Sequence, residues 1–359
     1  MSENFDNKIK GLTLENFTCF SKAEMTFSSG INVFIGENGT GKTHILKYMY
    51  AITSINQHYE RKSSSKNYNA DIGTIIMKPD QLSYTIPLEV FAIKDLSELK
   101  RFKTDHFMFK LQMDGDLYFE YCFYSPSVLT PIFSFYEKPM SKPIFIPAHE
   151  MISTHRGFIP NYLERENDYD KTYFDLAVLL QKANLKNEPK NLLEDILSEI
   201  NIDIKLEDNI FYIYSEGNKV RASLSAEGIR KIAQVIQLIR NGSIKENSIL
   251  FWDEPEVNLN PKYIKIVAKF LQTLAKNGVQ IFVATHDYLL AHLLSLDAEY
   301  RDQTQAPPMR FFSFYKGEDG SEIEAADTLA GLQNNVMLDE YAAYYDLEQS
   351  LFRKSMQNV

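Results

Sequence analysis

Residues 33–46, VFIGENGTGKTHIL, place three glycines within six positions, follow them with Lys-Thr, and have apolar runs on both sides. Glycine adopts backbone angles that are closed to other residues and has no Cβ to hold a ligand away. INVFI before the loop is typical of a buried strand, and the apolar spacing after it predicts a helix from Lys42 to about Ile55. A glycine-rich loop between a strand and a helix N-terminus can wrap an anion.

The loop fits Gly-x-x-x-x-Gly-Lys-[Ser/Thr], the phosphate loop of nucleoside triphosphatases. In that reading Lys42 reaches the β and γ oxygens, and the Thr43 hydroxyl binds Mg²⁺. A glycine-rich turn without a ligand is the plain alternative, but the pattern arises by chance in a chain of this length only about once in two hundred. The predicted nucleotide-binding residues are Gly36, Asn38, Gly39, Thr40, Gly41, Lys42 and Thr43.

A second acidic motif follows an apolar run at residues 248–261, SILFWDEPEVNLNP. A buried parallel strand would end at Asp253-Glu254, at the sheet edge where open α/β sheets bind ligands. Asp253 could then hold Mg²⁺, and Glu254 could orient and deprotonate the attacking water. A strand that merely ends in an acidic turn is disfavoured by the phosphate loop elsewhere in the chain.

A third strand-like run, VQIFVATHD at 279–287, ends in Thr285-His286-Asp287, and His286 stands 33 residues after Asp253. Because parallel strands end at the same sheet edge, His286 could hydrogen-bond the γ-phosphate and sense its loss. A structural histidine is the alternative. The spacing after the Asp-Glu pair favours the catalytic role.

Composition narrows the class of protein. The chain has 359 residues and a formal net charge of −10, which argues against a protein coated by nucleic acid and leaves a local basic patch open. The two cysteines, Cys19 and Cys122, have no metal-ligand spacing. No signal peptide or membrane-spanning apolar run stands in the sequence, so we expect a cytoplasmic protein without a membrane partner.

The rest of the chain predicts further elements. Strand-like runs from Leu82 to Ile146, which include LSYTIPLEVFAI and KPIFIP, predict an antiparallel subdomain. Helical stretches predominate from about Tyr169 to Ile200, and a helix ends at Gly242. The tail at 327–352 has amphipathic helix spacing with tyrosines, which fits either a docking element or a helix that covers its own core.

Four segments resemble a known family when taken in order: LTLENFTCF…INVFIGENGTGKT, SAEGIRKIA, LFWDEPEVNLNP and VATHD. They are similar to ABC-class ATPases of the RecF, SMC and OLD kind, specifically the stand-alone AAA_15/AAA_21 type. The resemblance implies an α/β fold, a P-loop ABC-type ATPase head with a mixed central sheet, an antiparallel β subdomain and an inserted helical lobe. We expect residues 1–150 and 243–359 to form the ATPase lobe and 151–242 the helical lobe.

The resemblance also assigns further site residues. LSAEGIRK would be the signature motif, which binds the γ-phosphate held by a second subunit. Either Ser225 is the signature serine, or Gly228 is its second glycine and Ala226 replaces the serine; we favour Gly228, because a residue without Cβ approaches phosphate most closely. EVNLNP would be the D-loop, with Asn258 at the dimer contact. The glutamine usual after the strand IFIP is replaced by His149-Glu150.

The function implied by the resemblance is an ATPase that closes into an ATP-sandwich dimer or a higher homo-oligomer, with ATP and Mg²⁺ as cofactors. Compact heads of this type belong to bacterial phage-defence systems, where they work with a separate effector, a nuclease or toxin. A RecF-like DNA-repair or DNA-clamping ATPase is the alternative, and a transporter subunit is disfavoured by the RecF-like N-terminus.

Overall fold

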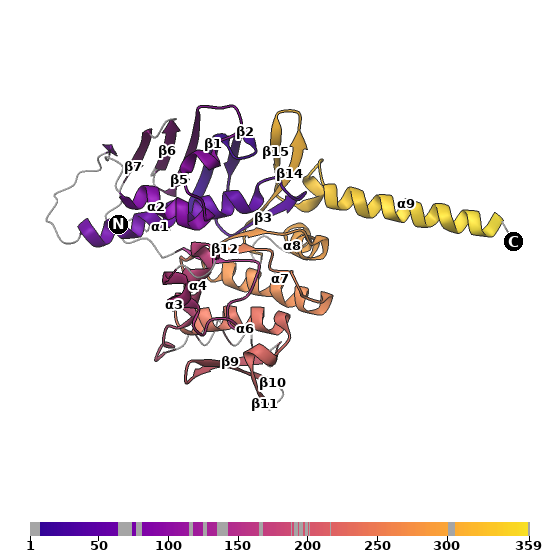
Figure 1. Ribbon diagram of the computed structural model, residues 1–359. Helices are drawn as coiled ribbons and strands as arrows, with labels where there is room; N and C mark the ends of the chain where they lie inside the picture. Colours follow the sequence, from indigo (N-terminus) through magenta and orange to yellow (C-terminus); the bar gives the residue numbers. More distant parts are fainter. Residues whose placement is uncertain are drawn as a thin grey trace, which may run out of the picture.

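The computed structural model contains three β-sheets with helices between and below them (Figure 1). It describes residues 8–63, 74–76, 81–114, 118–124, 128–134, 143–164, 168–187, 189, 193, 197, 200, 202–215, 217–300 and 306–357.

The central sheet has the strand order β15-β14-β3-β13-β12-β8. The five strands from β14 to β8 run parallel, and β15 adds an antiparallel edge. This confirms the predicted α/β class and mixed sheet. The strands are β3 (Ile31–Gly36), β8 (Ile144–Ile146), β12 (Ile249–Asp253), β13 (Gln280–Ala284), β14 (Met309–Gly317) and β15 (Gly320–Ala326).

Both faces of the central sheet are buried. Successive side chains of a strand point to opposite sides, so they enter the two cores alternately. On β12, Leu250 and Trp252 join the core shared with the helices below the sheet, whereas Phe251 joins the core above it. On β13, Phe282 likewise points upward. The upper core is rich in phenylalanine, with edge-to-face contacts such as Phe34 to Phe312 at 5.3 Å. A strand buried on both faces explains the continuous apolar runs in the sequence.

An antiparallel sheet covers the upper core, with the strand order β2-β1-β5-β6-β7-β4 (Figure 1). Helix α1 (Lys42–Ser63) lies between the two sheets and buries Leu46, Met49 and Ile52. It extends eight residues beyond the predicted end at Ile55. The strands are β1 (Ile9–Phe17), β2 (Phe20–Thr26), β4 (Thr74–Ile76), β5 (His106–Met113), β6 (Tyr118–Tyr124) and β7 (Val128–Ser134).

Two segments expected as strands of this subdomain lie elsewhere. LSYTIPLEVFAI contributes to helix α2 (Gln81–Phe91), which packs on α1 and buries Ile86 and Val90 one turn apart. The apolar and aromatic residues of this run favoured a strand, but contact with α1 stabilises the helix. KPIFIP contains β8, which pairs in parallel with β12 in the central sheet.

The lobe below the central sheet lies between β8 and β12 in the chain. It combines helices with a small antiparallel sheet, whose strand β9 our sequence interpretation missed. The predicted helix at 191–200 falls largely outside the described residues. The elements are α3 (Phe158–Leu163), α4 (Lys171–Leu180), α6 (Glu227–Arg240), β9 (Ile202–Glu207), β10 (Ile210–Ser215), β11 (Asn218–Arg221) and the 3₁₀ turn η3 (Ala222–Leu224). The domain boundaries at 150 and 242 stay predictions.

Three helices follow β12. Helix α7 (Pro261–Lys276) and α8 (Tyr288–Tyr300) pack together below the sheet, and α9 (Val336–Gln357) projects away from the body (Figure 1). The 3₁₀ turns η1 (Leu96–Leu99) and η4 (Leu329–Gly331) complete the described elements. Within the described ranges, none of the helices combines the length and apolar character needed to cross a membrane.

Candidate functional site

The loop between β3 and α1 adopts a conformation that requires glycine at two points. Gly36 has φ +133°, and an added Cβ would collide with the backbone of Phe314. Gly41 has φ +92°, and its Cβ would lie 2.6 Å from both Cys19 Sγ and the Phe20 ring. The backbone therefore turns tightly from the strand into the helix, and α1 starts at Lys42 with its N-terminus at the loop.

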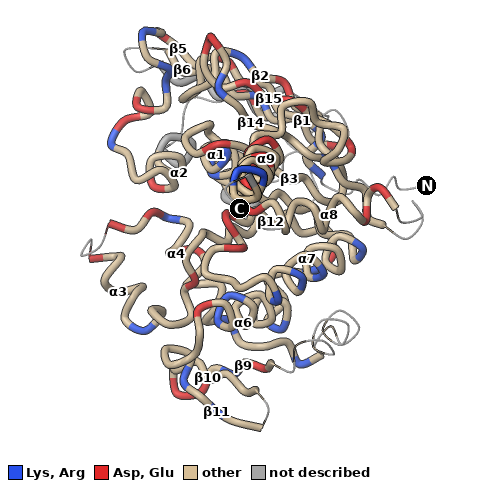
Figure 2. The backbone as a smooth tube through the Cα atoms, turned by 90° about the vertical axis from the view of Figure 1, so that its right-hand side faces the viewer, with Lys and Arg blue, Asp and Glu red and all other residues tan. Residues whose placement is uncertain are grey.

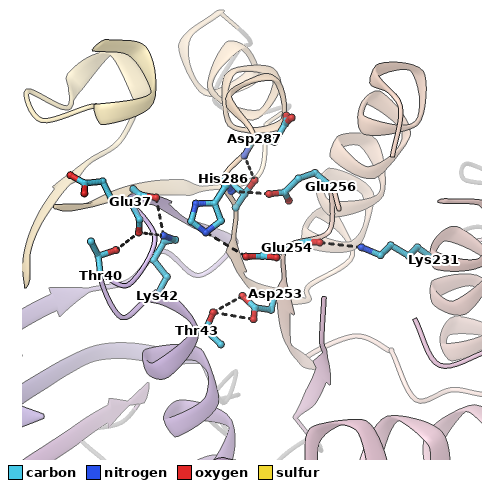
Figure 3. A network of polar contacts seen from close by, with 12 residues as sticks. Glu37, Thr40, Lys42, Thr43, Lys231, Asp253, Glu254, Glu256, His286 and Asp287 are labelled. Carbon is cyan, nitrogen blue, oxygen red and sulfur yellow. Dashed lines mark hydrogen bonds and ion pairs between the residues drawn. The ribbon is translucent and has the colours of Figure 1, made fainter. Parts of the chain in front are cut away.

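Lys42 lies inside this loop (Figure 3). Its Nζ donates hydrogen bonds to the carbonyl oxygens of Gly36 at 2.8 Å and Glu37 at 2.7 Å. The Thr40 hydroxyl also donates to Glu37 O, at 2.7 Å. Burial lowers the pKa of Lys42 to about 8, against the opposing effect of nearby carboxylates, of which Asp253 is the strongest. A buried ammonium whose main partners are carbonyl oxygens is suited to receive an anion.

Thr43 and Asp253 meet although 210 residues separate them in the chain. The Thr43 hydroxyl lies 3.1 Å and 3.0 Å from the two carboxylate oxygens of Asp253. Burial raises the pKa of Asp253 to about 7, with the Thr43 hydrogen bond opposing the shift. The contact places the two predicted metal ligands side by side.

This pair fits a magnesium ion. Mg²⁺ is usually held by one or two protein oxygens together with phosphate oxygens and waters, so a hydroxyl and one carboxylate suffice. Burial disfavours the ionised form of Asp253 although Lys42 and Lys47 interact with its charge, and a divalent cation bound to the carboxylate would favour that form. Among the described residues, no group of three or more His, Cys, Asp or Glu could hold a metal by itself.

Glu254 and His286 face each other beside Asp253 (Figure 3). His286 Nε2 lies 3.4 Å from Glu254 Oε1, and both side chains are about one-third exposed. Burial and the charge of Lys42 lower the pKa of His286, so its ring is neutral at pH 7. Glu254 has φ +46°, a left-handed conformation that is uncommon outside glycine. Such strain at the end of a strand is typical of functional sites.

Glu256 is a site residue that sequence reasoning missed. Its Oε1 accepts a hydrogen bond from the backbone N–H of His286 at 2.7 Å, and burial raises its pKa. It thereby ties the segment after β13 to the segment after β12. The sequence signal was its place two residues after Glu254 in the same acidic motif.

Lys231 is a second missed residue, contributed by α6. It is 2% exposed, and burial lowers its pKa. Its Nζ donates to the carbonyl oxygen of Glu254 at 3.3 Å (Figure 3). A charged side chain at this depth links α6 directly to the segment that carries Glu254. Its spacing three residues after Gly228 gave no signal that it would point toward the acidic motif.

The predicted signature residues lie at the start of α6, apart from the phosphate loop. Ser225 is half-buried, and Ala226, the N-cap residue, is exposed. Gly228 is buried, and a Cβ there would lie 2.6 Å from Leu259 Cδ2 of the predicted D-loop. Asn258 is exposed with φ +63°. The signature and D-loop segments thus pack against each other within one chain.

Glu150 also connects to this turn. Its carboxylate accepts from Arg230 Nε at 2.6 Å, and Arg230 Nη1 donates to the Ser225 carbonyl. Glu150 therefore holds the signature turn through Arg230. His149 is exposed, whereas His155 is buried and its two ring nitrogens contact the carbonyl oxygens of Ile152 and Asn209.

Family models match most of the chain in two parts. Residues 8–123 match an AAA ATPase domain, AAA_15, and residues 138–291 match AAA_21, an AAA domain described as a putative AbiEii toxin of a type IV toxin–antitoxin system. The phosphate loop falls in the first match, and Asp253, Glu254 and His286 in the second.

Curated relatives include RecF DNA replication and repair proteins. The protein from Streptococcus gordonii is 40% identical over 60 residues, which are 17% of this chain and 16% of the relative. The protein from Streptococcus agalactiae serotype Ia is 30% identical over 106 residues, 28% of this chain and 29% of the relative. The aligned segments thus span less than a third of these relatives.

Solved structures show the same fold over most of the chain. The Smc head of Pyrococcus furiosus, solved with the C-terminal domain of ScpA, has a TM-score of 0.54 at 10% identity and covers 89% of this chain and 96% of its own. The SMC head of Thermotoga maritima has a TM-score of 0.50 at 13% identity, with 89% and 99% covered. At these identities the likeness shows the P-loop ATPase head fold.

Proposed function

Because the chain belongs to the RecF/SMC type of AAA-domain ATPases, we propose that it hydrolyses ATP with Mg²⁺ at the edge formed by β3, β12 and β13. We further propose that two copies close around ATP, and that this closure controls a separate effector protein, a nuclease or toxin, in bacterial anti-phage defence.

The observation that carries the proposal is the convergence of three distant segments on one sheet edge. Lys42 and Thr43 follow β3, Asp253 ends β12 and Glu254 follows it, and His286 follows β13 (Figure 3). Thr43 touches Asp253, and Glu254 faces His286. A chance glycine turn would not meet a carboxylate pair and a neutral histidine at this place.

Each side chain then has a chemical task. Lys42 would bind the β and γ oxygens, and Thr43 with Asp253 would hold Mg²⁺, which when bound neutralises phosphate charge. Glu254 would orient the attacking water and accept its proton. His286, neutral and next to Glu254, would donate a hydrogen bond to the γ-phosphate. Lys231 would hold the segment that carries Glu254, and Glu256 would hold the segment that carries His286.

A second copy completes the site in this proposal. The exposed N-terminus of α6 presents a helix dipole and free backbone donors that suit a phosphate group held by another subunit. Ser225, Ala226 and Gly228 mark that turn, and Asn258 lies beside it. The Smc head that was solved with ScpA is a precedent for a head that works with a separate protein.

Glu254→Gln tests the assignment of the base. The amide keeps the shape of the side chain but cannot take a proton, so ATP turnover should fall about 10²–10⁴-fold while MgATP still binds. Glu318→Gln, an exposed position in the β14–β15 turn, is the matched control and should hydrolyse ATP normally. Turnover by Glu254→Gln at the wild-type rate would remove Glu254 from the mechanism.

A RecF-like role in DNA binding is the second candidate, and a basic stripe on α7 favours it. Lys262, Lys265, Lys269 and Lys276 recur at helical spacing along one face of the helix, over about 21 Å. A hollow of about 470 Å³ beside them is lined by three of these lysines. Figure 2 shows the basic residues gathered along α7 in a chain that is acidic as a whole.

Salt-dependent DNA binding tests this second candidate. Lys265→Ala combined with Lys276→Ala should weaken binding to duplex DNA and lower the slope of log affinity against log salt by about two. Lys22→Ala with Lys103→Ala, two exposed lysines near the end of β1 that lies away from α7, is the control. If neither pair changes binding, or the wild type binds no DNA at 50 mM salt, α7 is not a DNA-binding surface.

A further inference from the structure

Helix α9 presents a wide apolar face that is largely exposed in the described structure, apart from the contact of Tyr341 with Tyr288 at its root. Residues 338–348 and 351–356 are exposed around the whole helix. Eight large apolar side chains among them are 43–67% exposed: Leu338, Tyr341, Tyr344, Tyr345, Leu347, Leu351, Phe352 and Met356. Figure 1 shows α9 leaving the body near β14 and α8.

These apolar side chains form one half of the helix. At 100° per residue they fall within a half-cylinder, whereas Asp339, Asp346, Ser350 and Arg353 lie on the other half. Within the apolar half, Glu348 is the one acidic side chain near the middle. A surface helix normally buries such a face, since helices of this length gain most of their stability from tertiary packing.

The base of α9 is held firmly, so the direction of the helix is fixed. The Asn335 side chain accepts from Leu338 N at 3.2 Å, and the Ser313 hydroxyl donates to the Asn334 carbonyl. Tyr341 packs on Tyr288 of α8 with ring centroids 5.1 Å apart. Tyr288 stands two residues after His286, so the root of α9 adjoins the nucleotide edge.

Charge along α9 indicates what covers the face. The half from 336 to 346 carries Asp339, Glu340 and Asp346 and no basic residue, whereas the half from 347 to 357 carries Arg353 and Lys354 with one acidic residue, Glu348. Of these charges, Glu340 and Lys354 border the apolar half. Two copies in antiparallel orientation bring the acidic half of one against the basic end of the other. Parallel copies would place like charges together.

The spacing supports the same arrangement. Glu340 and Lys354 are fourteen residues apart, about four turns, so they lie on the same flank with Leu347 midway. In an antiparallel pair centred on Leu347, each Glu340 is level with Lys354 of the other copy. Such flank positions are where antiparallel coiled coils place their ion pairs.

We propose that the apolar face of α9 binds α9 of a second copy of this chain, antiparallel and related by a two-fold axis near Leu347. The four aromatic rings, 60–67% exposed, would together bury roughly 350–600 Å² per copy. With the aliphatic side chains this approaches the ~800 Å² per partner of a standard interface. The pairing is independent of nucleotide, unlike the ATP-driven closure proposed above.

Sedimentation of the full-length, nucleotide-free protein tests the pairing. Wild type and Lys42→Ala should both dimerise, which separates this contact from closure around ATP. Leu351→Asp should raise the dimer dissociation constant at least tenfold, because two charges enter the apolar contact. Ser350→Asp, the neighbouring position on the polar half, is the matched control and should leave dimerisation unchanged. Glu348→Leu should tighten the dimer.

A charge swap tests the orientation. Glu340→Lys or Lys354→Glu alone should weaken the dimer several-fold, and the two together should restore it. Singles that change nothing would rule out the antiparallel register. A wild-type protein that stays monomeric at about 100 µM without nucleotide would overturn the proposal, whether its α9 then bound lipid vesicles or a different protein.

Discussion

Asp253 shows how burial affects a single charged side chain at the candidate site. Its carboxylate is 8% exposed and accepts hydrogen bonds from Thr43. Burial nevertheless raises its pKa to about 7, because a hydroxyl compensates a carboxylate only in part. Lys42, whose pKa falls to about 8, shows the same cost for positive charge. Burial thus opposes the charged form of both side chains, a cost that the Mg²⁺ and the phosphate of the proposed site would offset.

This cost predicts how stability depends on pH. A carboxyl group with a folded pKa near 7 binds its proton more tightly in the folded state than in the unfolded state, where an aspartate has its ordinary pKa of 3.8. The contribution of Asp253 to the free energy of unfolding therefore falls as the pH rises from about 4 to 7. Asp253→Asn removes this titration while still accepting from Thr43.

The measurement compares wild type and Asp253→Asn by denaturant unfolding without nucleotide at pH 5 and at pH 7.5. The free energy of unfolding of the variant should rise relative to that of the wild type as the pH rises. The relative gain between about pH 4 and pH 7 should be on the order of 2–4 kcal/mol. A difference that stays constant between the two pH values would show that Asp253 ionises normally. Titrating groups that do not interact with Asp253 cancel, because both proteins carry them.

At the scale of elements, the start of α6 decides how a second copy could reach the nucleotide. Gly228 is covered by Leu259 of the same chain, so Gly228→Glu would disturb the predicted D-loop inside one molecule. Ala226 is the exposed N-cap residue of the same turn. A substitution there changes the outer surface and leaves the packing against Leu259 intact. The role of the turn in trans stays a prediction.

Ala226→Glu should block ATP-driven closure. The carboxylate would face the γ-phosphate of the other copy across the interface, and like charges repel strongly in a partly desolvated site. In a Glu254→Gln background, light scattering with ATP should show association at least tenfold weaker than in Glu254→Gln alone, with unchanged ATP binding. Val220→Glu on β11 of the same lobe is the control. Unimpaired association would place this turn outside the interface.

Elements that show their type in their own residues could be predicted from the sequence. Elements whose type depends on contacts with segments far away in the chain could not. The strand, loop and helix around Lys42 follow from apolar runs and glycine positions. Helix α2 was mistaken for a strand because its burial against α1 is not visible in its own alternating pattern. β8 is three residues long, and its parallel partner β12 lies about 100 residues away in the chain.

The same distinction applies to the site. Motif spacing located Lys42, Thr43, Asp253 and His286, and the structure brings them to one edge. Motif spacing could not indicate that Lys231 would reach the Glu254 carbonyl, because that contact depends on how α6 packs under the sheet. Their roles in binding and catalysis stay predictions.

For the whole molecule, the sheet edge where β3, β12 and β13 end lies between two buried cores and next to the root of α9. β12 and β13 contribute to both cores, so a shift at their ends is shared by the antiparallel sheet above and the helical lobe below. The contact of Tyr288 with Tyr341 extends the same edge to α9. The edge proposed to bind nucleotide is therefore in contact with both cores and with α9.

The last prediction is that this chain has no nuclease activity of its own and acts through another protein. Hydrolytic nucleases usually need a carboxylate cluster that binds one or two metal ions. In the described part of the chain, no group of three or more His, Cys, Asp or Glu could hold a metal ion by itself, and Asp253, Glu254 and Glu256 lie at the edge proposed to bind ATP. Purified protein should leave plasmid DNA and bulk RNA intact with ATP and Mg²⁺ or Mn²⁺, and any toxic or nucleolytic phenotype should require a second polypeptide, identified by pull-down and mass measurement. Metal-dependent cleavage by the isolated chain that survives in Glu254→Gln, and is lost on changing an acidic residue away from the ATP edge, would contradict this and make the chain its own effector.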